Sequence, residues 1–425
     1  MKPINELSLY EVVEAIRGGQ ISALEVAIAC IERIEQREPD VQAFESFDAD
    51  KALTAAKALE AVGPDSVLCG APIGIKDIID TVEYPSRCGS PIYSNRTPHA
   101  DASCVALCRA AGANIFGKMV TTEFAYFSPG KTRNPHNLSH TPGGSSMGSA
   151  AAVADYMLPF AFGTQTAASV TRPSAYCGVI GYKASYGNFD LQGVCGLAPS
   201  LDTLGFITRD LRDIPLMRSV LCGDTASLVR IDDSSKIRIG FVRTPHWAMA
   251  EESTQHLLED TARNLSQSGA QLSELQLPPA FSDLANLHNS IMSFEVARAR
   301  SYEFTQHREL LSEQFSALVE NGFGLSYQEY LKAKTRIAEV SQLLKQLFDQ
   351  YDVFLVPSAP GEAPYGLRTT GDPIFNRMWT VLGVPSITLP AGNGDHGLPL
   401  GVQIVGAFNN DNQLVSIANW IRKQL

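Results

Sequence analysis

The sequence predicts an α/β protein. Short apolar runs typical of buried strands, at residues 68–80, 113–119 and 158–163, alternate with longer runs of helical periodicity. No internal repeat, low-complexity linker or block of like charge marks a domain boundary. We therefore expect a single domain over residues 1–425, with a mostly helical section at about 250–350.

The first predicted elements are two helices and a strand. Between Ser8 and Arg37 apolar residues recur at helical spacing, and Gly18-Gly19 interrupts the pattern. The Ile-rich run at 68–80 predicts a buried strand that ends near Lys76. A lysine at the end of a buried strand requires an explanation, because an ammonium group is costly to bury.

The middle of the chain is rich in glycine and small residues. In the segment TPGGSSMGSAAAVADYM, glycines precede an alanine run that favours a helix, so Ser145 and Ser146 are expected at a loop-to-helix junction. Backbone N–H groups at such a junction have no partner within the helix. A strand, the polar turn TQTAAS and a second strand, GVIGYKA, follow, and YDVFLVPSAP and PSITLPAG are predicted strands after the helical section.

Composition and charge exclude several classes of protein. Hydrophobic residues make up 44% and charged residues 19% of the 425 residues, which is typical of a globular protein. The net charge of -11 disfavours nucleic acid partners, which are bound by clustered Lys and Arg. The N-terminal segment lacks the apolar core of a signal peptide, and no 18-residue apolar run follows, so we expect a cytoplasmic protein without a membrane partner.

The cysteines do not indicate a disulfide framework or a metal site. All eight are scattered without a CxxC pair, and Cys104 and Cys108 are spaced as two core residues on one helical face. We therefore expect reduced thiols, no metal and no cofactor.

Three motifs give the chain its resemblance to a known family. These are GIKD around Lys76, PGGSSMGSAAA around Ser145 and GTQTAASVTRPSAYCG around Ser169. Together with the N-terminal helices and the closing GLPLGVQIVGA, they resemble the amidase signature family over nearly the full chain. The resemblance implies an α/β/α sandwich with a large mixed sheet flanked by helices, a Ser-cisSer-Lys triad of Lys76, Ser145 and Ser169, and a cis peptide between Gly144 and Ser145. It also implies that the section at 250–350 varies with substrate.

The residue types support this chemistry independently. A serine hydroxyl needs a base to become a nucleophile, and no histidine lies in the three motifs. Burial of Lys76 would favour its neutral form, which could accept the Ser169 proton through the Ser145 hydroxyl and later return it to the leaving amine. Ser169 would carry the acyl group until water releases it.

The family pattern further implies an oxyanion hole built by the backbone N–H groups of Thr166, Ala167, Ala168 and Ser169. The sequence departs from the family here, because Ala167 and Ala168 replace a usual pair of glycines and would be strained at a positive φ. Gln165 replaces a usual Asp and Thr171 a usual Arg, which suggests one exchanged local pair. Arg172 stands one place later, and Met147 replaces another glycine.

Substrate contacts are expected from Tyr126, Asn376 and Trp379, on their position in the resemblance. A rival interpretation takes Gly144 to Gly148 as the G-x-S-x-G elbow of an α/β-hydrolase, with Ser146 as nucleophile and His396 as its distant base.

Three functions remain open from the sequence. The chain is expected to be an amidohydrolase that cleaves a small-molecule carboxamide to a carboxylate and ammonia or an amine. The alternatives are the ammonia-releasing subunit of a tRNA-dependent amidotransferase and a catalytically weakened binding or scaffold protein. Assembly into a homo-oligomer is compatible with each.

Overall fold

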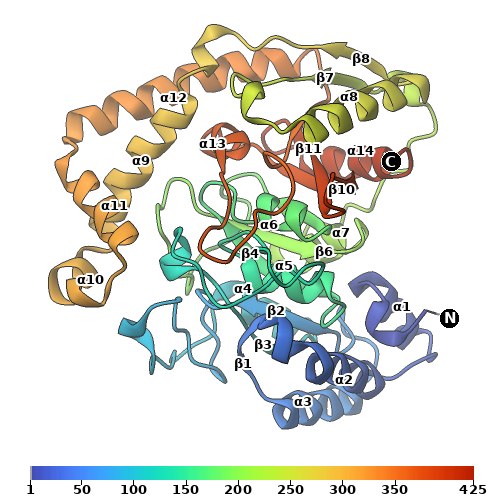
Figure 1. Cartoon of the computed structure of the whole chain (residues 1–425). Helices are drawn as coiled ribbons and strands as arrows, with labels where there is room; N and C mark the ends of the chain where they lie inside the picture. Colours follow the sequence, from blue (N-terminus) through green and yellow to red (C-terminus); the bar gives the residue numbers. More distant parts are fainter. Residues whose placement is uncertain (1) are drawn as a thin grey trace.

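The computed structural model describes residues 2–425, and within them eleven strands form one mixed sheet (Figure 1). The order of strands across the sheet is β1-β3-β2-β4-β6-β5-β10-β11-β9-β7-β8. The pairs β2–β3, β2–β4, β7–β8 and β7–β9 are parallel, and the remaining pairs are antiparallel. The strands span β1 Phe44–Phe47, β2 Pro72–Lys76, β3 Asn114–Met119, β4 Phe160–Gln165, β5 Ile180–Lys183, β6 Thr203–Thr208, β7 Arg238–Phe241, β8 Gln271–Glu274, β9 Val353–Pro357, β10 Ser386–Asn393 and β11 Pro399–Gly406.

Helices cover both faces of the central strands. Every residue of β2 to β6, β9 and β11 is buried, which requires cover on both sides of the sheet. The predicted α/β fold with a large mixed sheet is thereby confirmed. The helices span α1 Leu9–Arg17, α2 Ala23–Val41, α3 Ala49–Val62, α4 Ser103–Ala110, α5 Met147–Ala154, α6 Thr171–Tyr176, α7 Asp213–Cys222, α8 Glu252–Gln267, α9 Leu284–Ala299, α10 Ser301–Gln306, α11 Glu313–Gly324, α12 Tyr327–Phe348, α13 Ile374–Val381 and α14 Asp411–Arg422.

The two N-terminal helices form as predicted, and capping explains where they begin. Ser8 and Glu11 form a capping box at the start of α1, and Ser22 and Glu25 form one at the start of α2. Gly19, between the helices, has a φ of 67°, a conformation that glycine adopts without strain. Several strands were not predicted, namely β1, β6, β7, β8 and β11.

The helical section at 250–350 contains α8 to α12 and the short strand β8. In Figure 1, α9 to α12 extend to one side of the sheet, where α9 packs against α11, α12 and α13. The interpretation of the whole chain as one domain stays a prediction. Within residues 2–425, no helix has both the length and the apolar character that a membrane span requires.

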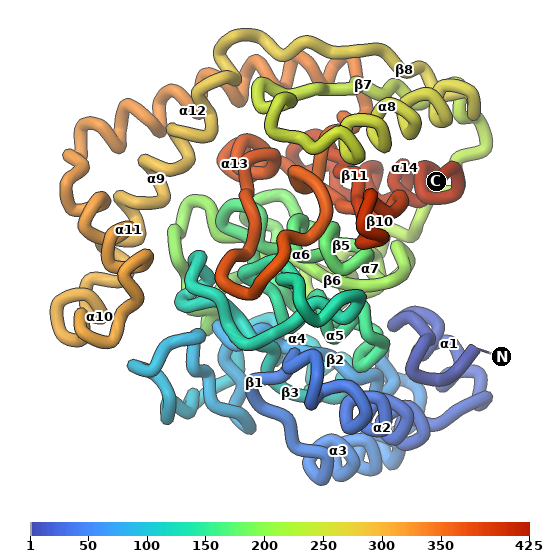
Figure 2. Tube along the Cα trace, in the orientation of Figure 1, coloured from blue at the N-terminus to red at the C-terminus, as the bar shows by residue number. Residues whose placement is uncertain are grey.

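Two loops far apart in the sequence meet over the sheet. The segment after β9 passes beside the loop that precedes Ser145 (Figure 2), and His140 forms isolated bridges with Tyr365 and Gly366. This contact brings residues near 370 close to the two serine motifs.

Candidate active site

Lys76 is the last residue of β2, and its side chain is fully buried. Its Nζ lies 2.7 Å from the Ser145 Oγ and 2.8 Å from the Thr164 Oγ1. Burial lowers the pKa of Lys76 from its usual 10.5 to about 7, and the negative charge of Asp202 opposes this shift. A large share of Lys76 is therefore neutral near pH 7, so its Nζ has a free lone pair.

Ser145 follows a cis peptide bond, as the resemblance implied, at the junction between a loop and α5. The carbonyl of Gly144 accepts a hydrogen bond of 2.8 Å from the Arg172 guanidinium, which ties this loop to α6. Gly143 has a φ of 81°, and an added Cβ would lie only 2.9 Å from the Cα of Pro173. The loop therefore requires glycine at position 143.

Ser146 does not face the pocket. Its hydroxyl lies 3.3 Å from the backbone nitrogen and 3.4 Å from the carbonyl oxygen of Thr164, and the side chain is fully buried. His396 is exposed in a turn near Glu362. The geometry thus contradicts the elbow interpretation, in which Ser146 would be an accessible nucleophile.

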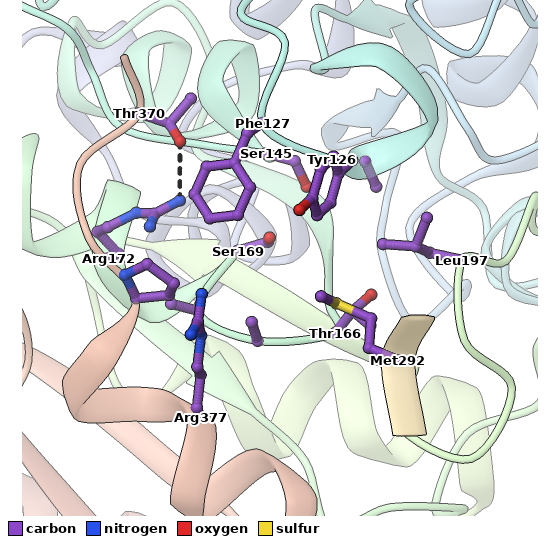
Figure 3. A pocket seen from close by; sticks show the side chains of 14 residues that line it. Tyr126, Phe127, Ser145, Thr166, Ser169, Arg172, Leu197, Met292, Thr370 and Arg377 are labelled. Carbon is purple, nitrogen blue, oxygen red and sulfur yellow. Dashed lines mark hydrogen bonds between the residues drawn. The ribbon is translucent and has the colours of Figure 1, made fainter. Parts of the chain in front are cut away.

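Ser169 lies in the turn between β4 and α6, and it lines the same pocket as Ser145 (Figure 3). Among residues 2–425, the backbone N–H groups of Thr166, Ala167, Ala168 and Ser169 donate no hydrogen bond. Neither alanine has a positive φ, so the replacement of the usual glycines leaves this turn unstrained. The Ala167 carbonyl is held by the Thr380 hydroxyl at 2.7 Å.

Gln165 and Thr171 form one neutral hydrogen-bonded unit. The Gln165 Oε1 accepts from the backbone N–H groups of Val170 and Thr171 at 2.9 and 3.0 Å, and it lies 3.1 Å from the Thr171 hydroxyl. Its Nε2 donates to the Thr380 hydroxyl at 3.0 Å. The two departures from the family pattern therefore contact each other, as the idea of an exchanged pair predicts.

Asp202 is a buried carboxylate behind the turn, and no pattern in the sequence distinguishes it. It accepts hydrogen bonds from the Thr166 hydroxyl and from the backbone N–H groups of Leu197 and Ala198. Burial raises the pKa of Asp202 to about 6, against these hydrogen bonds. Asp202 thus links the turn at Thr166 to the loop that carries Leu197, and its charge acts on Lys76.

The pocket encloses about 360 Å³, including the part open to solvent. Tyr126 lines it, as expected. Its full lining is Ala125, Tyr126, Phe127, Ser145, Thr166, Ala167, Ala168, Ser169, Arg172, Leu197, Met292, Thr370, Pro373 and Arg377.

Asn376 and Trp379 lie elsewhere than expected. Asn376 is fully buried and donates to the Gln403 Oε1 at 2.7 Å, while Trp379 packs on Phe354 in the core. Neither lines the pocket in the described chain; Pro373 and Arg377 do so instead. Pro373 and Arg377 are four residues apart, so they lie on one face of α13. Asn376 and Trp379 lie on another face of the same helix.

Comparison with known proteins places the chain in a family. The family model described as Amidase matches residues 25–415. The chain belongs to the amidase family. Its fold and motifs are those of amidase signature enzymes, so it is a hydrolase that acts on amide C–N bonds.

The curated relatives of this amidase include components of a larger enzyme. The A subunit of glutamyl-tRNA(Gln) amidotransferase from Solidesulfovibrio magneticus is 32% identical over 464 residues, and the match covers 96% of this chain and 94% of that protein. The A subunit from Roseiflexus castenholzii is also 32% identical, and the match covers 99% of this chain and 96% of that protein.

Solved structures share the fold. A crystal structure of an amidase superposes with a TM-score of 0.90 at 26% identity, covering 99% of this chain and 100% of that one. A bacterial aryl acylamidase of the amidase signature family superposes with a TM-score of 0.85 at 23% identity. The match covers 100% of this chain and 97% of that one. The TM-score is 0.89, at 23% identity, for a protein from a vestigial complex that reveals the evolutionary origins of an s-triazine catabolic enzyme. The match covers 98% of each chain.

Proposed function

We propose that this amidase hydrolyses its substrate through an acyl-enzyme on Ser169, with Lys76 and Ser145 as the proton shuttle. The observation that carries the proposal is the contact of 2.7 Å between the Lys76 Nζ and the Ser145 Oγ, in a fully buried setting beside Ser169. Burial supplies a base that is partly neutral near pH 7, and no histidine lines the pocket in the described chain.

The proton path follows from these positions. Ser145 takes the Ser169 proton as its own proton passes to Lys76, and the Ser169 oxygen attacks the amide carbon. The reverse path returns the proton to the leaving nitrogen, which departs as ammonia or an amine. Water then attacks the acyl-enzyme with the same shuttle as its base, which releases the carboxylate.

The oxyanion of the tetrahedral intermediate would be bound by the turn that carries Ser169. The N–H groups of Ala167, Ala168 and Ser169 have no acceptor within the described chain, so they are available to the substrate carbonyl oxygen. The backbone N–H of Thr166 also has no acceptor within the described chain, while its hydroxyl donates to Asp202 and a His288 ring nitrogen lies 2.7 Å from its carbonyl oxygen. We assign Thr166 a role in holding the turn in place.

Covalent labelling with a fluorophosphonate probe tests the proposal directly. The wild type is expected to gain one phosphonyl group, the mass of one probe less the HF that is released. Ser169→Ala is expected to lose labelling and at least about 1,000-fold of amide hydrolysis with an unchanged circular dichroism spectrum. Ser146→Ala is the matched control, since it removes a neighbouring hydroxyl that does not line the pocket. Labelling that persists in Ser169→Ala and disappears in Ser146→Ala would overturn the assignment.

The substrate is proposed to be a small-molecule amide, handled by the chain alone or as a homo-oligomer in the cytoplasm. The small pocket and the eight free cysteines are consistent with this proposal. No Asp or Glu lines the pocket among residues 2–425, so no carboxylate there could pair with the ammonium group of glutamine.

A second candidate is the ammonia-releasing component of an amidotransferase, because relatives at 32% identity are components of that kind. Stable co-purification with a larger partner and ammonia release from glutamine would favour it. A binding or scaffold role is the third candidate. A protein that neither reacts with the probe nor hydrolyses any amide would favour that role.

A further inference from the structure

Two positively charged side chains lie on one side of the nucleophile. Arg172 from α6 and Arg377 from α13 both line the pocket, and Figure 3 shows them on the same side of Ser169. Leu197 and Met292 lie on the opposite side, so the pocket has one cationic wall and one apolar wall. The proposed shuttle uses neither arginine.

Arg172 is only 3% exposed, and part of its guanidinium is hydrogen-bonded to the protein. Its guanidinium donates to the carbonyls of Gly144 and Gly371 at 2.8 and 2.7 Å and to the Thr370 hydroxyl at 3.1 Å. All three acceptors are neutral, and the Nε has no partner within the described chain. The charge of Arg172 therefore remains without a counter-ion.

Arg377 has fewer hydrogen-bond and ionic partners than Arg172. Its half-buried guanidinium has no hydrogen bond and no carboxylate within 4.0 Å among residues 2–425. The exposed Asp372 acts on both arginines only through space, and its carboxylate accepts from the backbone N–H of Ile374. Arg377 thus presents its donors to the pocket.

Arg377 differs from a buried arginine that lies away from this pocket. Arg209 donates to four backbone carbonyls, at distances of 2.7 to 3.2 Å. Partial burial of a charge without a partner is unfavourable, so a ligand that supplies the opposite charge would be bound strongly. Burial lowers the pKa of Arg172 to about 10 and also lowers that of Arg377, but arginine stays protonated at neutral pH.

We propose that the acyl part of the substrate ends in a carboxylate, which is bound by Arg377 with Arg172 adding positive charge beside it. The inference rests on the proposed function and names its substrate class, the monoamides of short dicarboxylic acids. The acyl C–N bond breaks, ammonia leaves with the proton returned by the shuttle, and water supplies the oxygen of the new carboxylate. The product is a dicarboxylate.

Steady-state kinetics on matched amides test the assignment. We compare succinamate with its neutral isostere, in which an isopropyl group replaces the carboxylate, and glutaramate with glutamine, which adds an ammonium group. The wild type is expected to favour succinamate by about 30-fold in kcat/KM, since a hydrogen bond to a charged group contributes about 1.5–3 kcal/mol. The kcat/KM for glutaramate is expected to exceed that for glutamine. Within residues 2–425 no carboxylate lines the pocket, so nothing there would pair with the ammonium group of glutamine.

The variant Arg377→Met keeps the unbranched apolar stem of the side chain and removes its charge, so it should abolish the preference for succinamate. Arg377→Lys should retain part of it. The matched control is Arg336→Met on α12, where an exposed arginine pairs with Glu339. This variant should prefer succinamate to its isostere by the same factor as the wild type. Succinate should also inhibit the wild type far more strongly than butyrate, a measurement that does not depend on the folding of any variant.

The outcomes separate the two proposals. Equal hydrolysis of succinamate and its isostere, or a preference that survives Arg377→Met, would overturn the carboxylate assignment while Ser169 remained the nucleophile. No hydrolysis of any amide, combined with no labelling of Ser169, would overturn the proposed function and the carboxylate assignment with it.

Discussion

The charge of Asp202 should set the pH at which this enzyme becomes active. Burial lowers the pKa of Lys76 to about 7, and the Asp202 carboxylate works against that shift. Asp202→Asn removes the charge and keeps an oxygen that can accept from the backbone N–H groups of Leu197 and Ala198, which now bind the carboxylate at 2.7 and 2.9 Å. The variant should therefore have a lower Lys76 pKa with little change of structure.

The size of the effect follows from the titration of Lys76. With a pKa of 10.5, about one lysine in 3,000 is neutral at pH 7, whereas a pKa of about 7 makes about half neutral. Burial thus increases the amount of free base by a factor of about 1,500. Because the proposed shuttle requires the neutral form of Lys76, kcat/KM in the wild type should fall with decreasing pH, to about one tenth of its plateau near pH 6.

The assay is kcat/KM for an amide over pH 5 to 9. We expect the acid limb of Asp202→Asn at lower pH than that of the wild type. Asp213→Asn is the control, since Asp213 is also fully buried with a pKa raised to about 7 but binds Tyr10 and Thr208 rather than the loop near Lys76. A limb that moves to higher pH in Asp202→Asn, or vanishes, would refute the reasoning, and a vanished limb would assign the titration to Asp202 itself.

Three further changes are informative. Lys76→Ala should lose several orders of magnitude on amides and less on esters, because an alkoxide leaves with less need of a proton; equal losses would contradict the shuttle. Ala167→Gly combined with Ala168→Gly should broaden acyl acceptance at a cost of about 0.5–1 kcal/mol per site in urea unfolding, and an unchanged substrate ranking would count against this. Lys118→Met should destabilise the fold by about 3–5 kcal/mol at pH 8, since it leaves the buried Asp77, 3.1 Å away, without its partner. The loss should be smaller at pH 5, because the pKa of Asp77 is raised to about 6 and its carboxyl is then protonated; a loss equal at both pH values would contradict this.

Local patterns in the sequence were sufficient to predict the strands that carry the motifs. The apolar run before Lys76 and the glycines before Ser145 determine a buried strand and a loop-to-helix junction through short-range effects. The edge strand β8 was missed because its residues, QLSE, are mostly exposed and carry no apolar pattern. No helix was predicted between the turn TQTAAS and the strand GVIGYKA, but α6 forms there with Pro173 in its first turn, where proline is tolerated.

Residues that reach the pocket through tertiary packing were not predictable in this way. Asp202 lies directly before β6, a strand that the sequence did not reveal, and it accepts a hydrogen bond from the loop at Leu197. The sequence does not reveal which face of α13 turns toward Ser169. The pocket therefore receives Arg377 rather than Asn376 or Trp379, which fill the core.

The helical section at 250–350 contributes a single side chain, Met292, to the pocket lining in the described chain. The groups proposed to move protons lie at the end of β2 (Lys76), in the loop before α5 (Ser145) and in the turn after β4 (Ser169), all outside that section. Random mutagenesis confined to α9 and its neighbours, with His288 kept because its ring contacts the Thr166 carbonyl, could therefore sample new specificities without disturbing catalysis. In a library of this kind, most losses of activity would reflect misfolding, and the survivors would differ chiefly at the apolar wall of the pocket.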